Sequence, residues 1–173
     1  MADISITERL FSSDSLVEIS QNRATLRENS CPDSVVEIVG IPEDVRILIV
    51  SRFPQTERFF GGDGIASRGD FSIIDEARHK LIHMEIKRIK NSSHIKTQLL
   101  GSSALVPYFR ALADKQLSEK HYLEGYTESF VAIGYTSLNK RSMGDRRING
   151  SGENIDDIKR IMYPGKLPYR SLC

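Results

Sequence analysis

The clearest pattern in the chain is a pair of short apolar runs with a polar segment between them. Residues 70–75 read Asp-Phe-Ser-Ile-Ile-Asp, and residues 81–87 read Leu-Ile-His-Met-Glu-Ile-Lys. The segment between them, Glu-Ala-Arg-His-Lys, is polar and short. Two such runs joined by a short polar turn predict an antiparallel β-hairpin. If the turn is centred on residues 77 and 78, the numbers of paired residues sum to about 155 (77 + 78).

Further strands and a helix are predicted on either side of this hairpin. Residues 35–40 and 45–50 are β-branched runs split by a segment of strong turn chemistry, which is typical of a strand pair or of one interrupted strand. Residues 93–120 carry apolar positions near helical spacing, and Pro107 should kink or split the helix that they form. Residues 129–137 predict another strand.

The remaining segments carry weaker patterns. A helix followed by a loop is expected over residues 1–30, and a glycine-rich loop over residues 54–69. Residues 139–153 are basic and glycine-rich, residues 155–162 predict a short helix, and we expect an irregular end. The order of these elements is typical of an α/β fold with a central mixed β-sheet flanked by helices.

Length and composition fit one soluble domain. The chain has 173 residues, of which 39% are hydrophobic and 27% charged. We expect a single domain over 1–173, with an N-terminal helix and loop region at 1–30, a core at 35–137, and a basic loop and C-terminal tail at 138–173. There is no apolar run of about 18 residues and no secretory signal pattern, and there are only two cysteines. These features predict a cytoplasmic protein without a membrane partner.

Charge is divided unevenly along the chain. Residues 1–86 contain 9 Lys and Arg against 15 Asp and Glu, a net of −6, and residues 87–173 contain 15 against 8, a net of +7. An acidic site bordered by a basic surface would produce this division, and so would chance segregation of solvated charge. The basic residues Lys140, Arg141, Arg146 and Arg147 could contact a phosphate backbone or could form a solvated loop.

The predicted hairpin brings two carboxylates and a lysine together. A pair sum of 155 places Asp70 opposite Glu85, and alternation along the strand puts Lys87 on the same face as Glu85. Facing carboxylates repel unless a cation lies between them, and Mg²⁺ or Mn²⁺ prefers such oxygen ligands. The ion would polarise a phosphate oxygen and activate water, while the lysine would offset charge in the transition state. The alternative is that these are edge or turn residues beside a solvated basic face.

These residues resemble the core motif of the PD-(D/E)xK, or restriction-endonuclease-like, nuclease superfamily. The resemblance rests on Gly69-Asp70 at the start of one strand, the triplet Glu85-Ile86-Lys87 on the next strand, and the helix that follows. It implies a restriction-endonuclease-like core and Mg²⁺- or Mn²⁺-dependent cleavage of DNA or, less often, RNA. Asp70 and Glu85 would be metal ligands and Lys87 the catalytic lysine.

The chain departs from the family in two respects and leaves other candidates open. The Gln-x-x-x-Tyr pattern of the RecB-like branch is absent, because Tyr108 lies ten residues after Gln98. Gly69 stands where the motif has proline. Gln98 could be a further catalytic residue on the helix or a surface glutamine, and Asp75 could replace Asp70 or cap the turn. Glu37 could supply an extra ligand, and His83 more readily stacks on the hairpin surface than acts as a base.

The sequence therefore predicts a metal-dependent endonuclease that hydrolyses phosphodiester bonds of DNA. Two alternatives remain: a non-catalytic interaction module that keeps the nuclease fold, and an RNA-directed nuclease of the same fold. A homodimer is possible, because two symmetric sites are the simplest way to cut both strands of DNA.

Overall fold

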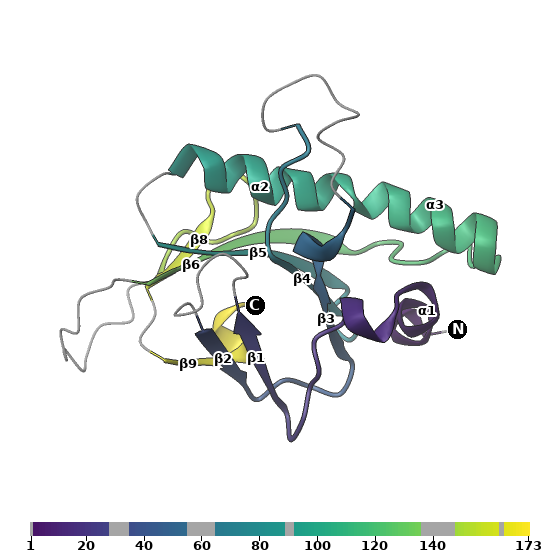
Figure 1. Cartoon of the computed structure of the whole chain (residues 1–173), viewed down its shortest axis with the longest axis horizontal. Coiled ribbons are helices and arrows are strands. Elements are labelled where there is room, and N and C mark those ends of the chain that lie inside the picture. The colour runs from purple at the N-terminus through teal and green to yellow at the C-terminus, as the bar shows by residue number, and fades with distance from the viewer. Residues whose placement is uncertain (1, 28–34, 55–64, 89–91, 136–147, 163–164) are drawn as a thin grey trace.

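The computed structural model describes most of the chain as two β-sheets with helices beside the larger one (Figure 1). The described residues are 2–27, 35–54, 65–88, 92–135, 148–162 and 165–173. The helices are α1 (Asp3–Leu10), α2 (Ser92–Ala104) and α3 (Val106–Leu117). The strands are β1 (Arg23–Arg27), β2 (Val35–Val39), β3 (Val45–Ile49), β4 (Phe71–Asp75), β5 (Lys80–Arg88), β6 (Thr127–Tyr135), β7 (Ile148–Asn149), β8 (Lys159–Met162) and β9 (Lys166–Pro168).

The larger sheet is mixed and has the strand order β3-β4-β5-β6-β8-β7. Strands β3, β4 and β5 are antiparallel neighbours, whereas β5, β6 and β8 run parallel to one another. Parallel neighbours need a long crossover connection, and helices α2 and α3 supply it between β5 and β6. The predicted α/β class, with a central mixed sheet flanked by helices, is confirmed.

The two faces of the larger sheet are covered differently. Helices α2 and α3 run along one face, and the small sheet β1-β2-β9 covers the other (Figure 1). Alternation along β5 sends Ile82, Met84 and Ile86 into the core against the small sheet. Leu81 joins a separate apolar cluster with α1 and α3. The polar residues His83 and Glu85 consequently lie on the face beneath the helices.

The predicted helix is split where the sequence indicated. Helix α2 ends at Ala104 and α3 begins at Val106 with Pro107 in its first turn, where the missing backbone N–H removes no helical hydrogen bond. Helix α2 also passes very close to the segment that precedes β4. A Cβ atom on Gly101 would lie 1.7 Å from the backbone oxygen of Ser67, so this approach needs glycine.

Four parts of the predicted secondary structure are wrong. Residues 23–27, expected in a loop, form β1, and β2 pairs with β1 and β9 instead of β3. The short helix expected over 155–162 is absent, because Lys159–Met162 forms β8 beside β6 and buries Ile161 completely. The C-terminal tail is not irregular, since β9 lies parallel to β2 and buries Leu167. Each of these short strands depends on distant partners for its hydrogen bonds and its burial.

Within the described ranges, the helices are too short or too polar to cross a membrane.

Candidate active site

The hairpin has the pairing that the sequence predicts. Phe71 lies opposite Met84 and Asp75 lies opposite Lys80, so paired residue numbers sum to 155. The backbone N–H of Asp70, directly before β4, donates to the Met84 carbonyl oxygen at 3.0 Å. The paired strands end at Phe71 and Met84, so Asp70 lies just beyond them at the open end of the hairpin, away from the turn.

Four predicted site residues are connected at this open end. The Ile86 backbone N–H donates to Asp70 Oδ2 at 2.8 Å, which fixes the aspartate against the Glu-x-Lys strand. Lys87 Nζ lies 3.7 Å from Glu85 Oε1 and donates to Gln98 Oε1 at 3.0 Å. The structure thus brings Asp70, Glu85, Lys87 and Gln98 together from the start of β4, the end of β5 and helix α2.

The group runs from a buried carboxylate to a solvent-exposed ammonium. Glu85 is only 2% exposed, whereas the side chain of Lys87 is 36% exposed. Asp70 and Gln98 are half-buried. Burial at Glu85 lowers the local dielectric and strengthens its interaction with cations. Ala132 of β6 lies beside Glu85 and adds little bulk.

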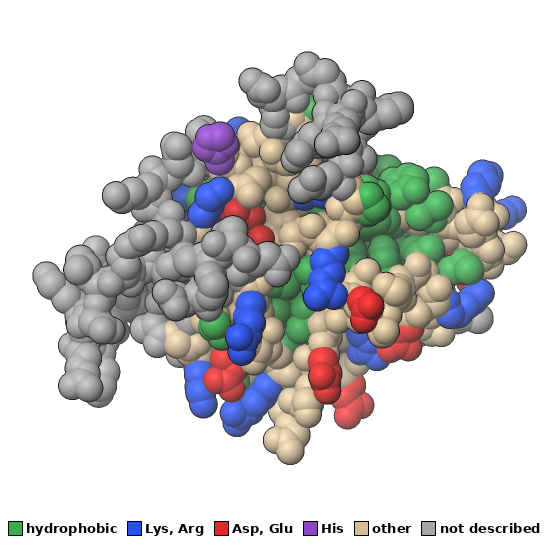
Figure 2. All heavy atoms as spheres, viewed as in Figure 1, with side chains coloured by type: hydrophobic (Ala, Val, Ile, Leu, Met, Phe, Trp, Pro, Cys, Tyr) green, Lys and Arg blue, Asp and Glu red, His purple; other side chains and the backbone are tan. Residues whose placement is uncertain are grey.

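Figure 2 shows that polar and hydrophobic side chains lie at different ends of the helical layer. Acidic, basic and histidine side chains gather near the start of α2, whereas hydrophobic side chains show over α3. The start of α2 is the end of the helical layer at which β5 finishes (Figure 1). The polar end of this face is therefore the end that holds the candidate site.

The structure explains why glycine precedes Asp70. The Gly69 backbone N–H donates to Ser102 Oγ at 2.9 Å, and proline has no N–H to donate. A Cβ atom at this position would also lie 2.8 Å from the Met84 carbonyl oxygen. The departure from the family motif thus has a local cause, and it leaves Asp70 in place.

The oxygen ligands at this site suit Mg²⁺ or Mn²⁺, which keep several water ligands, better than a metal ion whose ligands all come from the protein. Among the described residues, no group of three or more His, Cys, Asp or Glu side chains could hold a metal ion. The site offers two carboxylates, Asp70 and Glu85, while the amide oxygen of Gln98 accepts a hydrogen bond from Lys87. Mg²⁺ is commonly held by one or two carboxylates, with waters and substrate phosphates completing its octahedron. These residues match that pattern and would leave a zinc ion short of ligands.

The rival acids have other roles. Asp75 is completely buried at the turn end, and its Oδ1 accepts the backbone N–H of Arg78 at 3.0 Å, as expected of a turn cap. Glu37 lies in the small sheet, where it pairs with Arg23 and Lys166 at 3.2 and 3.7 Å. Neither acid lies with the four residues of the candidate site.

A second polar group lies under α2 and includes His83. This histidine is completely buried, which contradicts the expectation that it stacks on the hairpin surface. Ser72 Oγ lies 2.9 Å from His83 Nδ1, and Glu128 Oε2 lies 3.1 Å from His83 Nε2. The hydrogen bond from His83 lowers the pKa of Glu128 and keeps it ionised. The hydrogen bond from the Ser103 hydroxyl acts in the same direction with a smaller effect.

This Ser-His-Glu group lacks the access that a hydrolase nucleophile needs. Ser72 is 6% exposed and lies in the interior of β4, so no substrate carbonyl could reach its hydroxyl. We interpret the group as a structural link between β4, β5 and β6. The pair sum of 155 already places Ser72 opposite His83, so the sequence contained the signal for the first of its contacts.

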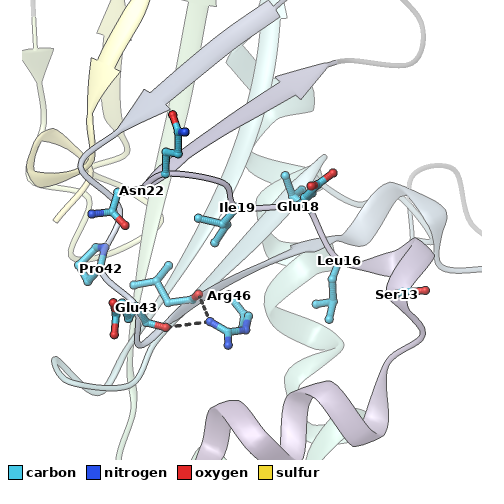
Figure 3. Close-up of a pocket in the computed structure, with 11 residues that line it drawn as sticks. Ser13, Leu16, Glu18, Ile19, Asn22, Pro42, Glu43 and Arg46 are labelled. Atoms are coloured by element: carbon cyan, nitrogen blue, oxygen red, sulfur yellow. Dashed lines mark hydrogen bonds between the residues drawn. The ribbon is translucent and has the colours of Figure 1, made fainter.

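The candidate nucleic-acid residues Lys140, Arg141, Arg146 and Arg147 lie outside the described residues. A hollow of about 700 Å³ lies elsewhere, between residues 13–22 and the start of β3 (Figure 3). Its arginine, Arg46, already donates to the backbone oxygens of Glu43 and Val45 at 2.9 and 2.8 Å and pairs with Glu8. The hollow therefore offers no comparable set of catalytic groups.

Comparison with known proteins adds no relative: no family model matches the chain, and neither a curated protein nor a solved structure matches it.

Proposed function

We propose that this protein is a Mg²⁺- or Mn²⁺-dependent endonuclease that hydrolyses phosphodiester bonds of DNA, with the fold of the restriction-endonuclease-like superfamily. The observation that carries the proposal is the meeting of Asp70, Glu85, Lys87 and Gln98 at the open end of the β4–β5 hairpin. The resemblance in sequence implied an aspartate at one strand start, a Glu-x-Lys triplet on the next strand and a helix behind them.

The arrangement of strands supports the proposal of a restriction-endonuclease-like fold. The hairpin that carries the carboxylates belongs to a mixed sheet, and the next strand, β6, returns parallel to β5 after a helical crossover. Such a crossover places α2 over the end of β5, and Gln98 reaches Lys87 from there. The same segment order and the same residues would be needed in a nuclease of that superfamily.

Each residue of the site has a definable part in the proposed chemistry. Asp70 and Glu85 would hold the metal ion, which when bound supplies a Lewis acid for a phosphate oxygen and an activated water. The Lys87 ammonium would hold the attacking water and offset the negative charge that grows on the phosphate oxygens. Gln98, as the acceptor of the Lys87 hydrogen bond, would fix the direction of the ammonium group.

DNA is the substrate that the sequence resemblance implies, and RNA is the closest alternative. The net charge of +7 over residues 87–173 supports a polyanionic partner of either kind. A non-catalytic interaction module would not need a lysine held beside a buried acid, with a second acid bound to the same strand. The three possibilities differ in a simple cleavage assay.

The test is incubation of the purified protein with plasmid DNA and with RNA, each in Mg²⁺, in Mn²⁺ and in EDTA. A Glu85→Gln variant, purified in parallel, controls for contaminating nucleases. We expect metal-dependent cleavage of DNA by the wild type alone. RNA cleavage alone would move the substrate to RNA. If neither nucleic acid is cleaved, or if the variant cleaves equally, the proposed activity is wrong.

A further inference from the structure

Helix α2 contacts both strands of the hairpin through two polar side chains one helical turn apart. Gln98 and Ser102 stand at positions i and i+4, so they lie on the same face of the helix. Gln98 accepts a hydrogen bond from Lys87 on β5. Ser102 Oγ accepts one from the backbone N–H of Gly69, the residue before Asp70. One helix thus touches both the lysine and the aspartate segment of the site.

Ser102 holds the residue before the aspartate, just beyond the last backbone hydrogen bonds of the sheet. Strand β4 begins at Phe71, and the backbone bonds from Asp70 to Met84 and from Ser51 to Asp70, at 3.0 and 3.3 Å, end the ladder there. Gly69 has no side chain that could restrict it, so its position depends on its backbone contacts. The hydroxyl that receives its N–H belongs to a residue that is only 2% exposed.

We propose that Ser102 is a positioning residue, which supports the metal-binding carboxylate of Asp70 by holding the Arg68–Gly69 peptide directly before it. The proposal rests on the proposed nuclease function. Loss of the hydroxyl frees the Gly69 N–H and loosens the Arg68–Gly69 peptide, so the chain that leads into Asp70 moves more and its carboxylate leaves the Ile86 N–H more often. Groups that orient ligands from behind in this way commonly contribute about 10- to 100-fold to metal affinity or activity.

The neighbouring residue provides a matched control. Ser103 is also on α2, and its hydroxyl donates to Glu128 on β6 instead of contacting the aspartate segment. Ser103→Ala therefore removes one helix hydroxyl and one hydrogen bond to the sheet, as Ser102→Ala does. If Ser102 only stabilised the packing of α2, the two variants would behave alike.

The experiment is a calorimetric Mn²⁺ titration of the wild type, Ser102→Ala and Ser103→Ala, with hydrogen exchange of the Gly69 amide. We expect Ser102→Ala to weaken Mn²⁺ binding at least about tenfold and to speed exchange at Gly69. Ser103→Ala should stay within about twofold of the wild type, and Ser102→Thr, which keeps the hydroxyl, should recover most of the affinity.

The outcomes separate this proposal from the nuclease proposal. If the wild type binds Mn²⁺ and cleaves but Ser102→Ala binds Mn²⁺ as tightly, the positioning role is wrong and the nuclease stands. If the wild type neither binds Mn²⁺ nor cleaves, both are wrong. Should Ser102→Ala fail to fold, Ser102→Cys preserves the volume with a weaker acceptor, and it must also lower the Mn²⁺ affinity.

Discussion

The two ends of the β4–β5 hairpin both hold carboxylates, but these carboxylates have different neighbours. At the turn end, Asp75 is completely buried and receives two hydrogen bonds from Arg78 and one from the Tyr169 hydroxyl, at 2.9–3.0 and 2.6 Å. Burial, and then the hydrogen bond to Asp75, raise the pKa of Tyr169, so it remains a donor. At the open end, Asp70 accepts the backbone N–H of Ile86, and in the same strand Lys87 Nζ lies 3.7 Å from Glu85 Oε1.

The difference separates an acid that stabilises the fold from acids suited to a ligand. Protein donors surround Asp75, and its negative charge has no acidic neighbour across the strand pair, since Lys80 lies opposite. At the open end, two like charges share one site, an arrangement that lowers stability unless a cation joins them. Sites of this kind are expected where function requires them.

The largest effect that we expect is loss of cleavage when either open-end acid is removed. Asp70→Ala and Glu85→Ala should each abolish metal-dependent cleavage, because each removes a ligand. The free energy of unfolding in metal-free buffer should be unchanged or slightly higher, since one of two like charges is gone. Cleavage assays and thermal melts would check both points, and full activity in either variant would contradict the assignment.

A smaller loss of activity is expected at Lys87, which should affect turnover more than affinity. Lys87→Ala should lower the single-turnover cleavage rate about a hundredfold, as for other single electrostatic donors. Metal binding should survive in this variant. Lys87→Arg should recover little, because a planar guanidinium does not replace a compact ammonium. A wild-type rate for Lys87→Ala would leave the lysine as part of a basic face.

The turn-end acid should instead affect stability. Asp75→Ala leaves the buried Tyr169 hydroxyl without its acceptor, so we expect a loss of about 2–3 kcal/mol in the free energy of unfolding. Asp156→Ala is the matched control, because the side chain of Asp156 is 79% exposed and pairs with Lys96 at the surface. Its loss should be below about 1 kcal/mol. Equal losses in chemical denaturation would remove the distinction between buried and exposed acids.

The smallest predicted effect is on the pH dependence of stability. The pKa of Glu128 is lowered in the folded state, chiefly by the hydrogen bond from His83. The contribution of Glu128 to the free energy of unfolding is therefore present above its unfolded pKa and is lost as the pH falls through its folded pKa. The wild type should therefore lose more stability than Glu128→Gln on acidification below about pH 4–5, near the ordinary pKa of glutamate. Parallel melting curves from pH 7 to pH 3 would contradict this.

The sequence predicts the hairpin and its site better than the rest of the sheet. A tight turn and a two-residue repeat determine the pairing locally, and that pairing brings Asp70 beside the segment that carries Glu85 and Lys87. Pro107 likewise places the helix break. Strands β8 and β9 have no such local signal, because their hydrogen bonds come from β6 and β2, far away in sequence. The contact between Ser102 and Gly69 also depends on how α2 packs, which spacing alone does not reveal.

The most direct test of the account is whether a divalent ion stabilises the protein through the open-end acids. Thermal unfolding would be followed over a Mn²⁺ series for the wild type and for the Asp70→Ala/Glu85→Ala double variant, with Asp75→Ala for comparison. At a hundredfold excess over Kd, ion binding should stabilise the wild type by about 2.7 kcal/mol. Asp75→Ala should show the same increment from a lower baseline, and the double variant none. An equal rise in the double variant would show that the ion binds elsewhere and would contradict the account.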